Sequence, residues 1–153
     1  MGEQFDIVYT SWGTVVWLAD LQAWARNIAQ LLTPGGWFYF ADTHPVLNTA
    51  EVVDGALQFR RPYGDNVLET VNDARSYTDR SFVNEHTRAH FFAHSVGEIV
   101  TALADNGLKL EFLRERPILN WQHNELMVRG DDGYWRQPDC TLPLSLSLRA
   151  IAP

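Results

Sequence analysis

Apolar residues along the chain form short, continuous runs typical of strands, and between these runs they recur at the spacing of a helix. The run FDIVYT at 5–10 is continuous and rich in β-branched and aromatic residues, which is typical of a strand buried on both faces. After the turn at 11–13, Asp20 is placed to cap a helix. Its helical period is carried by Leu21, Trp24, Ala25, Ile28, Leu31 and Leu32. The segment Thr33-Pro34-Gly35-Gly36 stops the helix before an aromatic strand, WFYFA, at 37–41. This order predicts an α/β unit with a right-handed crossover.

A second helix between strands is predicted further along the chain. Residues 87–93 are strand-like, and Ser95 with Glu98 matches a capping box, in which the two side chains satisfy exposed backbone amides reciprocally. Asn106-Gly107 supplies a left-handed stop at the end of this helix. A strand then alternates through Leu108, Leu110 and Phe112. The alternating residues at 142–151 close the chain as a half-buried strand.

Two stretches show no sustained period. Residues 43–93 contain several prolines and glycines and are predicted to form a variable insertion or lid. Residues 117–141, rich in Trp, Asp and Pro, form a second irregular stretch. We find no internal repeat and no domain boundary, so residues 1–153 are predicted to be a single domain.

Composition narrows the classes of function. The apolar share of 46% is enough for a core, and 19 acidic against 12 basic residues give a net charge of -7, so neither nucleic acid nor an anionic membrane surface is an expected partner. No stretch reaches the length of apolar sequence that a membrane span requires, and the first residues, MGEQFDIVY, do not resemble a secretory signal. The single cysteine, Cys140, excludes an internal disulfide. A soluble, cytoplasmic protein is therefore expected.

Three blocks in this order resemble class I S-adenosylmethionine-dependent methyltransferases. They are FDIVYTSWG at 5–13, LLTPGGWFYFAD at 31–42, and HSVGEIVTALADNGLKLEFLRE at 94–115 paired with the terminal strand SLSLRA. They are similar to the fourth strand, the helix and fifth strand, and the sixth and seventh strands of that family. The resemblance implies a partial Rossmann-like α/β sheet, mixed because its last strand is antiparallel. It also implies S-adenosylmethionine as cofactor and methyl transfer to a small-molecule acceptor.

The departure from the family pattern is equally specific. In that family the cofactor lies against a first strand and a glycine-rich turn, and this sequence contains no G-x-G-x-x-G or G-x-G-x-G segment. Half of the cofactor pocket therefore has no residues to build it, and the strand at 5–10 is expected to lie at an apolar edge that invites pairing. Three completions stay open: a separate polypeptide supplies the missing N-terminal half, two copies pair as a homodimer, or the chain is a piece of a longer protein.

Candidate site residues follow the strands at 5–10 and 37–41. Because ligands bind at the carboxyl ends of parallel strands, Ser11, Trp12, Gly13 and Asp42 are the leading candidates. The resemblance implies that Ser11, Trp12 and Gly13 contact the cofactor and that Asp42 contacts the acceptor. An ordinary strand-to-helix turn is the alternative interpretation of residues 11–13. His44 is the candidate catalytic base, since a histidine can titrate near neutral pH. A structural role before Pro45 is its alternative.

Aromatic residues are candidates for lining the acceptor pocket. Trp17, Trp121 and Tyr63 are selected because they flank the strand ends or fall in the insertion. His86 and His90 have a spacing that could suggest a metal, but no third ligand is evident, so no metal is expected.

Two other functions compete with methyl transfer. A non-catalytic, self-associating or partner-binding module derived from the same fold would use the cofactor face as an interface. A hydrolase using Ser11, Asp42 and His44 has the residue types but not a nucleophile-elbow motif, and we rank it last.

Overall fold

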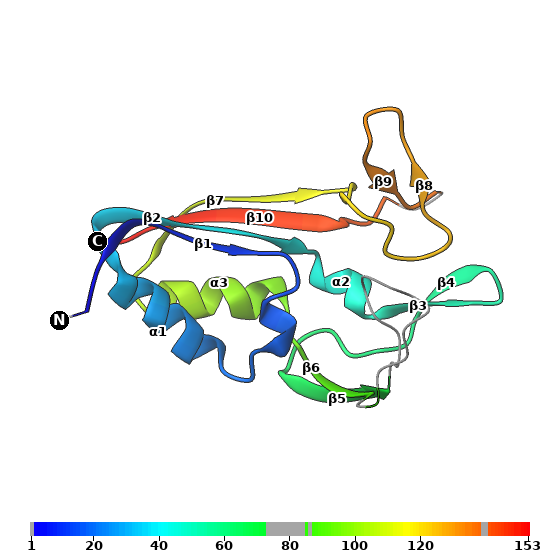
Figure 1. Cartoon of the computed structure of the whole chain (residues 1–153), viewed down its shortest axis with the longest axis horizontal. Coiled ribbons are helices and arrows are strands. Elements are labelled where there is room, and N and C mark those ends of the chain that lie inside the picture. The colour runs from blue at the N-terminus through cyan, green and yellow to red at the C-terminus, as the bar shows by residue number, and fades with distance from the viewer. Residues whose placement is uncertain (1, 73–84, 86, 139–140) are drawn as a thin grey trace.

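A four-stranded mixed sheet organises the molecule (Figure 1). The structure is a computed structural model that describes residues 2–72, 85, 87–138 and 141–153. In spatial order the strands are β1 (Phe5–Ser11), β2 (Leu32–Thr43), β10 (Ser145–Ile151) and β7 (Lys109–Arg116). β1 and β2 are parallel, whereas β10 is antiparallel to both of its neighbours. The predicted mixed sheet with an antiparallel last strand is confirmed.

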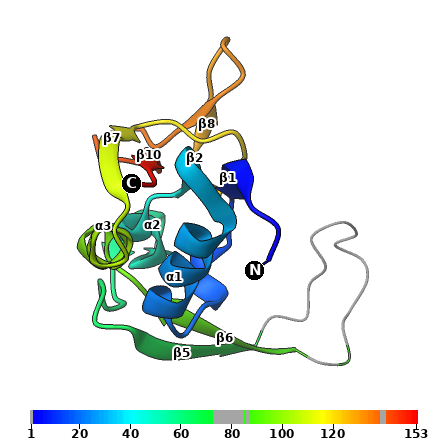
Figure 2. The ribbon, with the colours of Figure 1, turned by 90° about the vertical axis from the view of Figure 1, so that its left-hand side faces the viewer.

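Two helices cover one face of this sheet, as the two perpendicular views show (Figures 1 and 2). They are α1 (Leu21–Leu31) and α3 (Val96–Asp105). Asp20 caps α1 by accepting a 2.8 Å hydrogen bond from the Ala23 backbone N–H. The capping box at α3 is formed as predicted, because Ser95 Oγ accepts from the Glu98 amide and Glu98 accepts from the Ser95 amide. Both predicted helices are therefore confirmed, with their predicted caps.

The main hydrophobic core lies between the sheet and these helices. Its fully buried strand side chains include Phe38, Phe40 and Leu148, and α3 contributes Ile99. Trp24 of α1 packs edge to face on both phenylalanines. Because successive strand residues point to opposite faces, the sheet residues between these core positions face away from the helices.

That second face of the sheet is aromatic and carries no helix in the described part of the chain (Figures 1 and 2). Tyr9 stacks on Tyr39, and Tyr39 meets Phe112 edge to face. β1 also forms an edge of the sheet, and Phe5, Ile7 and Tyr9 are 44%, 52% and 57% exposed. The expected apolar edge strand is thus present, although its residues are not buried on both faces as the run itself suggested.

The strand β7 differs from its predicted alternation. Leu110 was expected to share a buried face with Leu108 and Phe112, but it is exposed, and Leu113 packs against the core instead. Leu110 pairs with the buried Ala150 but lies on an edge strand of the sheet, where it stays exposed. Beyond it, a register shift between Arg149 and Ala150 of β10 puts Phe112 against Tyr39 on the opposite face and Leu113 against the core. The predicted alternation was therefore wrong beyond Leu110.

The insertion at 43–93 contains regular structure that its sequence did not predict. It contains one helical turn, α2 (Pro45–Asn48). It also contains two hairpins, one of β3 (Ala50–Val53) with β4 (Ala56–Phe59) and one of β5 (Val67–Asn72) with β6 (Arg88–Ala93). A 3-10 helix, η1 (Val15–Trp17), precedes the insertion in the chain. Only β6 corresponds to a predicted strand. The elements are too short for a hydrophobic period to be visible.

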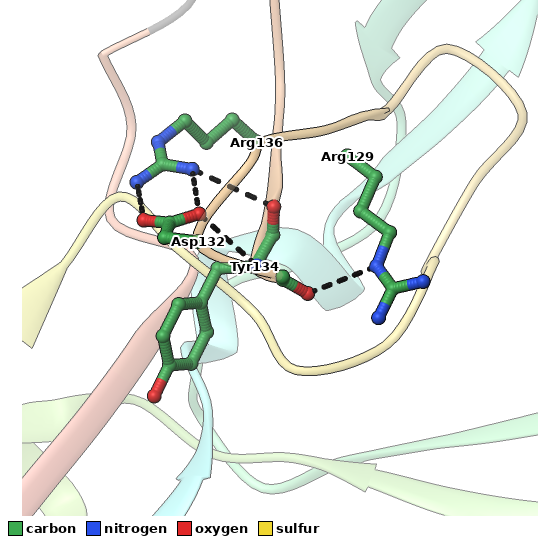
Figure 3. A network of polar contacts seen from close by, with 5 residues as sticks. Arg129, Asp132, Tyr134 and Arg136 are labelled. Carbon is green, nitrogen blue, oxygen red and sulfur yellow. Dashed lines mark hydrogen bonds and ion pairs between the residues drawn. The ribbon is translucent and has the colours of Figure 1, made fainter.

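The second irregular stretch contains a small hairpin of β8 (Val128–Arg129) and β9 (Trp135–Arg136). Figure 3 shows the polar network at its tip, where the Arg136 guanidinium holds Asp132 at 2.6 and 2.9 Å. The hydrogen bond from Arg136 lowers the pKa of Asp132 to about 2. Cys140, in the same stretch, lies outside the described residues.

Candidate functional site

The turn after β1 lies at the carboxyl ends of β1 and β2, where the sequence placed the site. Ser11 ends β1, and both Trp12 (φ 21°) and Gly13 (φ 74°) have positive φ. The Trp12 backbone N–H donates to the Ala41 carbonyl of β2 at 2.8 Å, and the Thr14 hydroxyl donates to the Ser11 carbonyl at 2.6 Å. A tryptophan with positive φ is uncommon, and such backbone geometry is concentrated at ligand sites.

Asp42 fixes this turn from the neighbouring strand. Its Oδ1 accepts from the Gly13 amide at 2.7 Å, and its Oδ2 accepts from the Thr14 amide at 3.2 Å. The Thr43 amide also donates to Oδ1, at 2.7 Å. Asp42 is only 3% exposed, and this burial raises its pKa although the backbone hydrogen bonds lower it. The carboxylate therefore positions the turn. The contact of Asp42 with the acceptor stays a prediction.

Trp12 and Trp121 meet beside this turn. Their rings lie edge to face with centroids 5.0 Å apart. Trp121 also packs against a second buried cluster, whose members are Leu47, Leu119, Met127 and Leu144. This aromatic pair thus connects the turn after β1 to the loop that precedes β8. Its rings place polarisable aromatic surface beside the turn.

His44 follows β2 directly and is engaged at both ring nitrogens. Nδ1 accepts from the Val46 amide at 3.1 Å, where it caps α2, and Nε2 lies 2.7 Å from Glu115 Oε1 on β7. The ring is buried, and the accepting Nδ1 makes Nε2 the protonated nitrogen. In this arrangement neither nitrogen is free to accept a proton, so the geometry fits the structural alternative. The catalytic role of His44 stays a prediction.

Two of the expected aromatic contacts lie toward the helix side of the molecule. Trp17 packs against Phe91 of β6, with centroids 4.6 Å apart. The Tyr63 hydroxyl accepts from the Val96 amide at the start of α3, at 3.3 Å. The structure therefore brings Ser11, Trp12, Gly13, Asp42 and Trp121 together, while Trp17 and Tyr63 contact other elements.

Two residues beside the strand ends were missed by the sequence analysis. Glu115 holds His44 from across the sheet, and His123 follows Trp121 in the second irregular stretch. Glu115 lies in a strand whose register could not be known in advance. His123 lies in a segment without periodicity, so no signal in the sequence could have found it.

Cavities and charged clusters add little else to this site. A hollow of about 460 Å³ lies between the amino ends of α1 and α3, but its carboxylates, Asp20 and Glu98, already serve as helix caps. Its histidine, His94, is hydrogen-bonded to the Leu18 carbonyl. Among the described residues, no three His, Cys, Asp or Glu side chains gather as metal ligands, and His86 lies outside them.

The helices of the described ranges are also too short or too polar to cross a lipid bilayer.

Comparisons with known proteins identify the fold. No family model matches the chain, and no curated protein sequence matches it significantly. A protein described as an S-adenosylmethionine-dependent methyltransferase from Listeria monocytogenes superposes with a TM-score of 0.66 at 14% identity, over 99% of this chain and 63% of that one. An S-adenosylmethionine-dependent methyltransferase from Mesorhizobium loti superposes with a TM-score of 0.57 at 18% identity, over 97% of this chain and 62% of that one. The chain has the fold of part of an S-adenosylmethionine-dependent methyltransferase.

A third methyltransferase structure extends the comparison. The glycopeptide N-methyltransferase MtfA, solved with S-adenosylmethionine, gives a TM-score of 0.53 at 15% identity, over 100% of this chain and 56% of that one. The chain therefore spans less than two thirds of the length of these methyltransferases. The resemblance read from the three sequence blocks is confirmed at the level of the fold.

Proposed function

We propose that this chain forms the acceptor side and one wall of the cofactor site of an S-adenosylmethionine-dependent methyltransferase that acts on a small molecule. The observation that carries the proposal is the Asp42 clamp, which joins the ends of two neighbouring parallel strands and presents the Trp12 turn. Related folds have been solved with S-adenosylmethionine and with S-adenosylhomocysteine, both in MtfA. Ligands of open α/β sheets bind at such strand ends.

The residues present fit one side of the cofactor. When bound, S-adenosylmethionine would supply a methyl group activated by its positively charged sulfur. Methyl transfer requires alignment and a dry, cation-tolerant surface more than it requires acid or base groups. The Trp12 and Trp121 rings offer that surface, and Asp42 holds Gly13 and Thr14 in place.

A second, glycine-rich segment is required in this proposal. The chain has no G-x-G-x-x-G segment, and its β1 edge is free among the described residues to accept a parallel strand. That segment would come from a longer version of this chain or from a separate polypeptide. Because the one cysteine cannot form an internal disulfide, we also propose a reducing compartment such as the cytoplasm.

Calorimetric titration with S-adenosylhomocysteine tests the proposal. We expect the 153-residue chain alone to bind weakly or not at all, and the chain joined to a glycine-rich strand-turn-helix segment to bind tightly. Tight binding by the chain alone would contradict the half-site. Gly13→Val should abolish binding by the joined protein, because φ is 74° there. Gly133→Val, at φ 84° in the β8–β9 hairpin, is the matched control.

A non-catalytic module is the second candidate function. The exposed apolar residues of β1 favour it, since such an edge pairs readily with another chain. This function predicts a defined oligomer whose thermal stability does not change with S-adenosylhomocysteine. A monomer that remains fully stable at high dilution would count against it.

A further inference from the structure

A small cavity lies where the insertion meets the loop before β8. Its volume is about 200 Å³. Its apolar wall is formed by the helical turn and hairpin of the insertion: Leu47, Ala50, Val52 and Leu57. Its polar rim is His123, Asn124 and Glu125. The cavity is thus small, with apolar side chains on one side and polar side chains on the other.

This cavity adjoins the candidate methyl-transfer site through two side chains. Leu47, in the cavity wall, belongs to the same buried cluster that Trp121 packs against. Trp121 in turn contacts Trp12 of the turn after β1. Packed side chains therefore connect the cavity wall to the turn after β1.

Only part of the polar rim is available to a ligand. Asn124 is engaged at both ends of its amide, since Nδ2 donates to Gln137 Oε1 at 3.1 Å and Oδ1 accepts from the Leu126 amide at 3.0 Å. The His123 ring and the Glu125 carboxylate make no hydrogen bond or ion pair with the residues that the structure describes. Asn124 thus fixes the loop, and its two neighbours present free groups.

Both groups can accept hydrogen bonds. His123 is an exposed residue, and the protein packed around its imidazole lowers its pKa by desolvation, which favours the neutral ring. Glu125 offers a carboxylate. The chemical group that matches a neutral imidazole and a carboxylate is a donor-rich cation such as an ammonium.

We propose that the cavity binds the methyl acceptor and that this acceptor is an amine with a compact apolar body. The body, a single ring or a branched alkyl group, lies against Val52 and Leu57, and the amino group lies between His123 and Glu125. The bound ammonium gives up one proton, to the neutral His123 ring or to water, before its nitrogen lone pair takes the methyl group. The identification of the bound amine as the methyl acceptor rests on the proposed function, whereas the binding of an amine in the cavity does not. The binding itself can be tested separately.

Benzylamine and benzyl alcohol are suitable probes because they share a ring and differ in charge. In an NMR titration of the full chain, we expect benzylamine to shift signals of residues 47–57 and 121–127. Glu125→Gln should weaken the binding of benzylamine about fivefold and change the affinity for benzyl alcohol by less than about twofold. Glu3→Gln, at an exposed acid near the N-terminus, should change neither.

A second pair of variants tests the cavity itself. Leu57→Trp should fill it and abolish binding of both probes, whereas Leu68→Trp, on exposed β5, should leave binding intact. Circular dichroism would verify that both variants fold. Benzylamine shifts confined to other residues, or unchanged affinity in Glu125→Gln, would overturn the proposal. Failure of the joined protein to bind S-adenosylhomocysteine would overturn the proposed function and leave these binding results unaffected.

Discussion

Oδ1 of Asp42 lies 2.7 Å from the backbone nitrogen of Gly13, so a side chain at the end of β2 holds the backbone that follows β1. The contact joins residues 29 positions apart in the sequence. Because Gly13 and its neighbours form the wall of the candidate cofactor site, the shape of that wall depends on a buried carboxylate that need not touch any ligand.

Replacing this carboxylate should destabilise the protein measurably. Asp42→Ala leaves the amides of Gly13 and Thr14 without their acceptor, and an unsatisfied buried donor costs about 1–3 kcal/mol. Urea unfolding at neutral pH measures the loss. Asp131→Ala, at an exposed acid in the β8–β9 hairpin, is the control and should change the free energy of unfolding by less than about 0.5 kcal/mol. Equal effects of the two substitutions would refute the clamp.

Asp42 should also impose a pH dependence on stability. Burial raises its pKa above the usual 3.8, so the folded protein binds this proton more tightly than the unfolded chain does. The stability that the protonated group contributes is complete below 3.8 and is lost as the pH rises through the raised pKa. Unfolding of wild type and Asp42→Asn should be compared between about pH 4 and pH 7. The difference in unfolding free energy, wild type minus variant, should fall with pH; a rise would contradict the shift.

Local signals in the sequence predicted the framework well. The caps at Asp20 and Ser95 involve residues three positions apart, and β1, α1 and β2 follow from runs of apolar residues. These features depend on short-range interactions, which the sequence displays directly. The order and direction of the strands came from resemblance to a family, since periodicity does not specify which strands pair.

The site was predictable only in part, because its contacts are long-range. Strand ends indicated Ser11 to Gly13 and Asp42, but the clamp between them and the partner Glu115 of His44 depend on strand register. His123 lies in a segment whose conformation is fixed by Asn124 and Gln137, thirteen residues apart. A bulge in the pairing of β10 with β7 likewise placed Phe112 against Tyr39 and Leu113 against the core. Such features arise from tertiary packing.

The contacts of His44 predict that it matters for stability. His44→Ala removes a buried ring with two hydrogen bonds, to Val46 and to Glu115, and should lower the free energy of unfolding by about 1–3 kcal/mol. His90→Ala, at an exposed histidine on β6, is the matched control and should have a much smaller effect. Thermal or urea unfolding distinguishes the two. An unchanged stability in His44→Ala would favour the catalytic role instead.

The core between the sheet and helices gives a third stability test. Phe40 is fully buried and packs against Trp24, so Phe40→Ala should cost about 3–5 kcal/mol through lost burial and an unfilled cavity. Phe59 is 57% exposed on β4, and Phe59→Ala should cost less than about 1 kcal/mol. If Phe40→Ala does not fold, its loss of the near-ultraviolet circular dichroism signal gives the same answer. Equal costs would show that the core lies elsewhere.

The exposed edge strand β1 predicts that two copies of the chain associate, and that one charged residue on this strand weakens the association. Ile7 is 52% exposed, whereas its neighbour Val8 packs against the core, so Ile7→Lys alters the edge and preserves the fold. Lysine on an edge strand opposes pairing because it would bury a charge between strands. In sedimentation velocity experiments we expect wild type to self-associate as concentration rises, and Ile7→Lys to raise the dissociation constant at least about tenfold.

The control for this edge is Val128→Lys, which adds the same charge at a 59% exposed residue of β8, away from β1. It should associate like wild type, since its strand is not the edge of the main sheet. If wild type is monomeric at every concentration, the edge does not pair two copies, and the homodimer is excluded as the completion of this fold. A glycine-rich segment would then be the remaining partner for β1, and Ile7→Lys should weaken S-adenosylhomocysteine binding by the joined protein while Val128→Lys does not.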